Sequence, residues 1–114
     1  MGPAGVYRAP AEVTSGTPTM LERVGTVPLG PGRPVTGGDV AADGSVVLLR
    51  TYGSVVAWPR APGSPLTDAF EGEPCEAPST IEAQGEAVAW LADDRGYVAV
   101  SEGVGPTVNL VEIG

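Results

Sequence analysis

Part of this sequence is repeated after an interval of 50 residues. Residues 35–53 read VTGGDVAADGSVVLLRTYG, and residues 85–103 read GEAVAWLADDRGYVAVSEG. When the two stretches are aligned, Asp43 coincides with Asp93, and an apolar run follows the aspartate in both copies. Each copy therefore contains two short β-rich runs with a turn between them, and any fold of this chain has to contain two related β units.

A period of about 40 to 50 residues made of short strands is typical of a β-propeller blade, in which four antiparallel strands run outward from a central channel. We therefore predict an all-β fold of propeller blades, a partial propeller of about two blades. Residues 1–34 are assigned to the outer strands of a preceding blade and a linker. Residues 35–84 are assigned to the first blade repeat, and residues 85–114 to a second, incomplete repeat.

Strands are predicted where apolar and polar residues alternate, or where β-branched residues cluster, between turn signals. The predicted strands are Gly5–Arg8, Leu21–Leu29, Val35–Ala41, Ser45–Thr51, Ser54–Trp58, Leu66–Phe70, Glu86–Leu91, Gly96–Ser101 and Thr107–Ile113. Leu66–Phe70 is expected to be the outer strand of the first blade, and residues 72–85 a loop between the two repeats. Gly (17) and Pro (12) make up a quarter of the 114 residues, which supports many turns.

The turns of the two repeats differ at the position of the glycine. Asp43-Gly44 between two apolar runs is typical of a tight hairpin, because glycine accepts the positive φ that such a turn imposes. In the second copy Asp94 occupies the position of that glycine, and the next glycine is Gly96. We therefore expect a longer turn in the second copy.

The charge of the chain restricts its partners. Fourteen Asp and Glu residues stand against six Arg, with no Lys and no His, so the net charge is −8. This balance argues against binding to nucleic acid or to an anionic membrane surface. A cationic ligand, a metal ion or a basic protein patch fits the charge, although acidity can also serve solubility alone. The absence of His excludes the His-dependent forms of serine triads and zinc hydrolases.

The sequence contains no apolar run of the roughly 18 residues that a membrane-spanning helix needs. Its first residues, MGPAGVYRAP, lack the charged and apolar regions of a secretory signal peptide. We therefore expect neither membrane insertion nor a secretion signal in this chain.

The segments DVAADGSVVLLRTY and AVAWLADDRGYVAVSEG resemble the strand–Asp-Gly–strand core of TolB-type and WD-repeat-like propellers. The stretch GEAVAWLADDRGYVAVSEG is also similar to repeats of extracytoplasmic propellers related to phytase-type esterases. Each resemblance covers about 20 residues, and Asp-Gly hairpins indicate a fold rather than an activity. The resemblance implies a propeller and suggests a location outside the cytoplasm.

Residues that begin the inner strands of a propeller point toward its channel, which places Thr36, Asp39 and Glu86 where a ligand would bind. Glu102 follows a second strand and is expected near Glu86. Oxygen ligands from adjacent blades suit calcium, so Asp39, Glu86 and Glu102 form a candidate metal site. In phytase-like propellers such a calcium ion attracts phosphate. The alternative is that these carboxylates cap turns or remain solvated.

Three further residues with polar groups lie at the end of a predicted second strand. Arg50, Thr51 and Tyr52 are candidates for binding an anion or the carboxylate of a partner. The alternative is structural: Arg50 pairs with an acidic neighbour, and Tyr52 packs between blades.

Two functional hypotheses follow from the sequence. The first is a non-catalytic binding or scaffold module, without a cofactor, that presents its channel face to a protein or small ligand. The second is part of a calcium-dependent phosphoesterase. In both, the exposed face of an incomplete propeller has to be covered, either by the remaining blades of a longer parent chain or by copies of this chain in a homo-oligomer.

Overall fold

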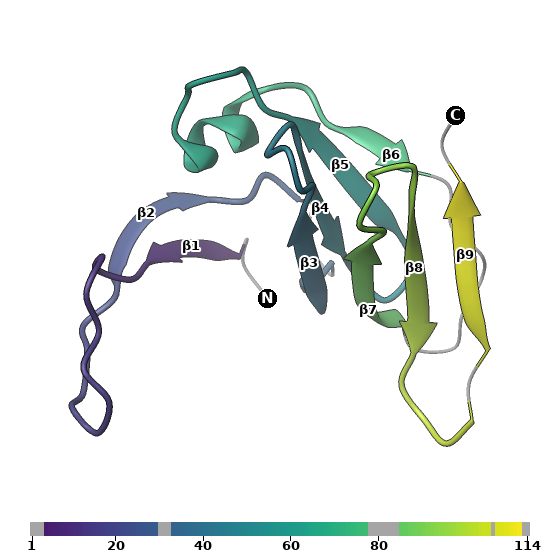
Figure 1. Cartoon of the computed structure of the whole chain (residues 1–114), viewed down its shortest axis with the longest axis horizontal. Coiled ribbons are helices and arrows are strands. Elements are labelled where there is room, and N and C mark those ends of the chain that lie inside the picture. Colours follow the sequence, from purple (N-terminus) through teal and green to yellow (C-terminus); the bar gives the residue numbers. More distant parts are fainter. Residues whose placement is uncertain (1–3, 30–32, 78–84, 106, 113–114) are drawn as a thin grey trace.

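The structure, a computed structural model, describes residues 4–29, 33–77, 85–105 and 107–112 (Figure 1). The strands are β1 (Gly5–Arg8), β2 (Glu22–Thr26), β3 (Gly37–Val40), β4 (Val46–Arg50), β5 (Val55–Pro59), β6 (Cys75–Ala77), β7 (Gly85–Trp90), β8 (Gly96–Ser101) and β9 (Val108–Glu112). A 3-10 helix, η1, spans Leu66–Glu71. Ile113, at the end of the last predicted strand, and residues 78–84 of the predicted loop lie outside the described residues.

The strands form three antiparallel sheets in chain order, which confirms the prediction of an all-β protein. The N-terminal sheet contains β1 and β2, the central sheet β3-β4-β5-β6, and the C-terminal sheet β7-β8-β9. In each sheet every strand pairs with the next strand along the chain, so the central and C-terminal sheets are meanders. Figure 1 shows the three sheets following one another across the molecule, with β3 and β7 close together.

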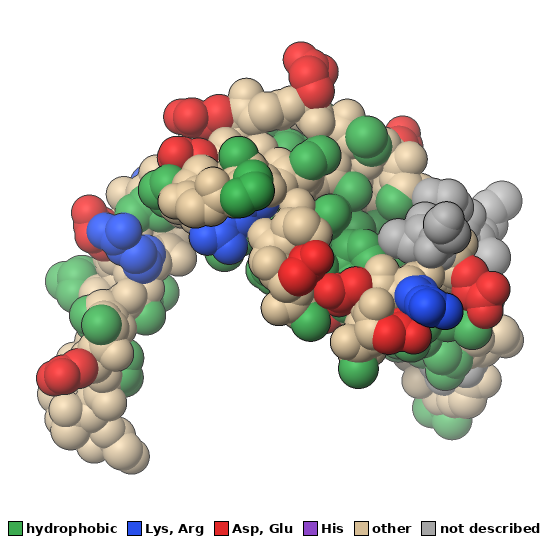
Figure 2. Space-filling view, turned by 45° about the horizontal axis from the view of Figure 1, so that its top comes forward, with side chains coloured by type: hydrophobic (Ala, Val, Ile, Leu, Met, Phe, Trp, Pro, Cys, Tyr) green, Lys and Arg blue, Asp and Glu red, His purple; other side chains and the backbone are tan. Residues whose placement is uncertain are grey.

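The connection between β1 and β2 projects away from the three sheets. Residues 9–21 form this arm, and their side chains are all exposed. Figures 1 and 2 both show the arm extending from one end of the molecule. The arm therefore adds nothing to the apolar cores described below.

The β3–β4 and β7–β8 hairpins have turns of equal length. The N–H of Ala41 donates to the carbonyl of Val46 at 2.9 Å, and the N–H of Leu91 donates to the carbonyl of Gly96 at 2.8 Å. These two bonds are 50 residues apart, like the aligned sequences. The expectation of a longer second turn is wrong.

The second turn keeps its length because Asp94 adopts the backbone conformation of the glycine it replaces. Gly44 has φ of +76° and Asp94 has φ of +58°. Aspartate tolerates this left-handed region better than most residues. In both turns the preceding aspartate, Asp43 or Asp93, accepts the backbone N–H two residues ahead, at 2.9 and 3.0 Å. A side-chain bond thus supports each turn.

The predicted outer strand Leu66–Phe70 is wrong, because these residues belong to η1. Pro65 precedes the helix with φ of −57°, and its carbonyl accepts a backbone N–H three residues on at 3.1 Å. The turn brings Phe70 edge-on to Trp58, with ring centroids 5.3 Å apart. The fourth strand of the central sheet is Cys75–Ala77, which pairs with β5 and lies within the predicted loop.

The central sheet has an apolar core on each face. One core joins it to the N-terminal sheet and η1, and its buried members are Val27, Leu29, Val47, Val56, Trp58 and Ala69. The other joins it to the C-terminal sheet, and its buried members are Leu48, Val55, Val88 and Tyr97. Neighbouring residues of β4 alternate between the two cores, as residues of a strand buried on both faces must.

The described residues cover the C-terminal sheet on one face only. Val88, Tyr97 and Ala99 are buried on the face toward the central sheet. The alternate residues Ala87, Ala89, Val98, Val100, Val108 and Leu110 form the opposite face, called the open face below. Val108 and Leu110 are 65 % and 55 % exposed. An apolar sheet face of this kind is expected to be covered in the functional molecule.

Within the part of the chain that the structure describes, no helix has the length and apolar character needed to cross a membrane.

Candidate functional site

Two of the predicted ligand residues lie at the contact between β3 and β7. The hydroxyl of Thr36 donates to the carbonyl of Gly85 at 2.6 Å. One carboxylate oxygen of Asp39 accepts the backbone N–H of Trp90 at 2.8 Å, and the other accepts the N–H of Val40 at 2.9 Å. These side chains therefore join the central sheet to the C-terminal sheet.

A residue that sequence reasoning assigned only to a turn provides a second link between these sheets. The carboxylate of Asp94, in the β7–β8 turn, accepts the backbone N–H groups of Ala42 and Asp43 at 2.8 and 3.2 Å. Both donors lie in the β3–β4 turn. The sequence shows an aspartate at the glycine position of the repeat. Its hydrogen bonds to the neighbouring sheet can be recognised only in the folded structure.

Arg50 also lies in the interface between the central and C-terminal sheets. It is 1 % exposed, and its guanidinium donates to the carbonyls of Thr51 at 3.3 Å and Ala87 at 3.5 Å. A Cβ at Gly85 would collide with this guanidinium, so the glycine makes room for the arginine. Burial raises the pKa of the neighbouring Tyr97, and the charge of Arg50 partly offsets that shift.

The other predicted residues are more accessible. Glu86 is half-buried on β7, Glu102 is exposed after β8, and Tyr52 is 43 % exposed in the β4–β5 turn. Among the described residues, no three carboxylate or thiol side chains are grouped so that they could hold a metal ion. The binding roles of these residues remain predictions.

A small pocket lies at the end of the central sheet where the β4–β5 turn meets the chain leading into β3. It has a volume of about 320 Å³ and is lined by Arg33, Pro34, Thr51, Tyr52, Gly53, Ser54 and Glu76. Thr51 and Tyr52, two of the residues predicted to bind an anion, line this pocket. Arg33, Ser54 and Glu76 come from segments that are separate in the sequence, so no local pattern brought them together.

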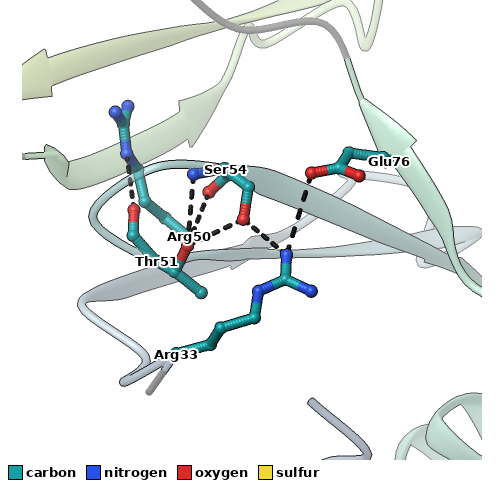
Figure 3. A network of polar contacts seen from close by, with 5 residues as sticks. All are labelled: Arg33, Arg50, Thr51, Ser54 and Glu76. Atoms are coloured by element: carbon teal, nitrogen blue, oxygen red, sulfur yellow. Dashed lines mark hydrogen bonds and ion pairs between the residues drawn. The ribbon is translucent and has the colours of Figure 1, made fainter. Parts of the chain in front are cut away.

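Figure 3 shows how a pair of hydroxyl groups holds the arginine of this pocket. The Nη2 atom of Arg33 donates to Ser54 Oγ at 2.7 Å. Ser54 Oγ and Thr51 Oγ1 share a hydrogen bond of 2.7 Å, and the N–H of Ser54 donates to Thr51 Oγ1 at 3.1 Å. Thr51 and Ser54 are 3 % and 7 % exposed. Buried hydroxyls therefore position a guanidinium that is itself only partly buried.

The acidic partner of this arginine is held loosely. Glu76 Oε1 lies 3.8 Å from Arg33 Nη2, which is beyond hydrogen-bonding distance, and the Glu76 side chain is 71 % exposed. An ion pair of this kind contributes little to stability. Arg33 thus has a strong contact with Ser54 and a weak one with Glu76.

Comparison with protein-family models, with curated proteins and with solved structures finds no match for this chain.

Proposed function

We propose that this chain is part of a β-propeller and acts as a non-catalytic binding or scaffold module. The equivalent bonds of the two hairpins, 50 residues apart, support two related units. The four-stranded meander and its face-to-face packing against the next sheet also agree with successive propeller blades. The lack of His removes the commonest general base and favours binding over catalysis.

The open face is the observation that carries this proposal. The corresponding face of the central sheet, which contains Leu48 and Val55, is covered by the C-terminal sheet. The open face is also apolar, and covering it would gain about 25 cal/mol for each Å² of apolar surface removed from water. We infer that a further antiparallel sheet covers it, supplied by the rest of a longer propeller.

Light scattering behind a sizing column tests the role of the open face. We expect the chain alone to associate as its concentration rises, and Leu110→Glu to reduce this association because it places a charge on the open face. Val104→Glu adds the same charge at a fully exposed loop position and should leave the association unchanged. A wild-type chain that stays monomeric at every concentration would refute the proposal. A discrete oligomer would show that copies of this chain supply the covering sheet.

The calcium-dependent phosphoesterase remains an alternative prediction. Both carboxylate oxygens of Asp39 accept backbone N–H groups, which leaves this residue less suited to a metal ion. A calcium titration followed by thermal unfolding tests the alternative. A rise in melting temperature that Glu86→Gln abolishes would favour the phosphoesterase over the scaffold.

A further inference from the structure

The pocket at Arg33 has the properties of a binding site for a singly charged anion. Its volume of about 320 Å³ falls in the range of small-molecule sites. The two contacts described for Arg33 both use Nη2. Nε and Nη1 have no partner among the described residues, and a guanidinium carries five N–H donors in a planar fork. One of these two nitrogens can form a parallel pair of donors with the N–H of Nη2 that does not bond to Ser54. Arg33 is therefore held in place and still has N–H donors available for a ligand.

The charges around this fork favour a singly charged carboxylate over a doubly charged phosphate. Arginine can bind either anion through two parallel N–H···O bonds, so the geometry of the fork alone does not choose between them. The pocket holds one positive charge, Arg33, beside one negative charge, Glu76, so a doubly charged anion would be repelled more strongly than a singly charged one. The net charge of −8, with acidic side chains spread over much of the face in Figure 2, adds to this preference.

The remaining wall of the pocket can contact an apolar group. Tyr52 and Pro34 line it together with Gly53, which has no side chain. A pocket lined by both an arginine and a tyrosine suits a ligand with a carboxylate at one end and an apolar body at the other.

We propose that this pocket binds the carboxylate of a small apolar organic acid or of a peptide C-terminus. Arg33 donates to both carboxylate oxygens, and Tyr52 contacts the apolar body. The Glu76 carboxylate competes with the ligand for the Arg33 guanidinium, and the bound ligand displaces it. This site lies within the central sheet and its connections, so it does not depend on a further sheet over the open face.

Calorimetric titration with benzoate tests the site, with benzamide as the uncharged control. We expect benzoate to bind and benzamide to bind much more weakly. Arg33→Gln should weaken benzoate binding about tenfold or more, because it removes a charge-assisted hydrogen-bonding fork. Arg95→Gln removes the same charge at an exposed position outside the pocket and should have no effect.

Glu76→Gln is the decisive variant because it should tighten benzoate binding, by about threefold for the loss of one nearby like charge at a surface site. A gain of affinity cannot come from misfolding. Weaker or unchanged binding in Glu76→Gln, equal binding of benzamide, or tighter binding of inorganic phosphate would each overturn the proposal. So would the absence of any binding by benzoate and by the peptide acid described next.

A short peptide with a free C-terminus, compared with its C-terminal amide, distinguishes the two sources of the carboxylate. Tighter binding of the peptide acid than of benzoate would assign the pocket to peptide C-termini. The reverse order would assign it to small organic acids. A wild-type chain that stays monomeric at every concentration but binds benzoate would refute the proposed module and leave this site standing.

Discussion

Replacing Asp94 by glycine tests whether the turn of the second hairpin serves its own strands or the neighbouring sheet. The sequence repeat alone suggests that Asp94→Gly is favourable, because it restores the Asp-Gly turn of the first copy. The structure predicts the opposite. The carboxylate of Asp94 accepts two backbone N–H groups of the β3–β4 turn, at 2.8 and 3.2 Å. Glycine has no group that can replace these bonds.

The gain from relieving the left-handed backbone conformation can be compared with the cost of losing the two hydrogen bonds. Asp94 has φ of +58°, and relief of the left-handed conformation is worth about 1 kcal/mol. Loss of two hydrogen bonds to a charged group, at a site where water can partly replace them, costs about 2 kcal/mol. We therefore expect Asp94→Gly to lower the free energy of unfolding by about 1 kcal/mol, or the melting temperature by about 4 °C.

Urea unfolding followed by tryptophan fluorescence measures this difference. Asp94→Ala should cost about 3 kcal/mol, because it loses both bonds and tolerates a positive φ poorly. Asp93→Asn removes a neighbouring charge that supports only its own turn, and it controls for the change in net charge. An Asp94→Gly variant about 1 kcal/mol more stable than the wild type, the full gain from relieving the left-handed conformation, would show that the bonds between the two turns contribute nothing.

Two further predictions concern a buried contact and an exposed turn. Gly85→Ala should lower the free energy of unfolding by about 1 to 3 kcal/mol, because its Cβ would collide with the buried Arg50 guanidinium. Gly53→Ala, where a Cβ has nothing within 4 Å, is the matched control, and equal effects in urea unfolding would contradict the packing described for Gly85. The pKa of Asp43 lies below its usual value because the hydroxyl of Ser45 and then its backbone N–H donate to the carboxylate. The lowered pKa means that ionised Asp43 stabilises the folded protein. This stabilisation is present above the unfolded-state pKa and is lost as pH falls through the lowered folded-state pKa. Ser45→Ala should raise the pKa of Asp43 in an NMR titration, and an unchanged midpoint would disprove the role of the hydroxyl.

The hairpins could be predicted from the sequence because their signals are local. Alternation, β-branched residues and the Asp-Gly turn specify β3 and β4, and the same pattern displaced by 50 residues specifies β7 and β8. The prediction of a strand at Leu66–Phe70 is wrong because the local signal is ambiguous. A short apolar segment fits a strand or a helical turn equally well, and in the structure the helical turn places Phe70 against Trp58.

The candidate sites could not be predicted in the same way. The sequence identified Thr36 and Asp39 as polar residues at the start of an inner strand, but it could not show that their hydrogen bonds cross to another sheet. The sequence indicated Arg50 and Tyr52 as residues that could bind an anion, whereas the arginine that lines the same pocket as Tyr52 is Arg33.

The sequence by itself thus determined the all-β character and the two hairpins, because each depends on residues that are close along the chain. Only the tertiary structure decided which polar groups face each other across the sheets and which remain accessible. Such contacts join residues about 20 to 50 positions apart, such as Arg33 with Ser54 and Asp39 with Trp90. No local pattern encodes a pairing of this kind, because it depends on how whole sheets pack.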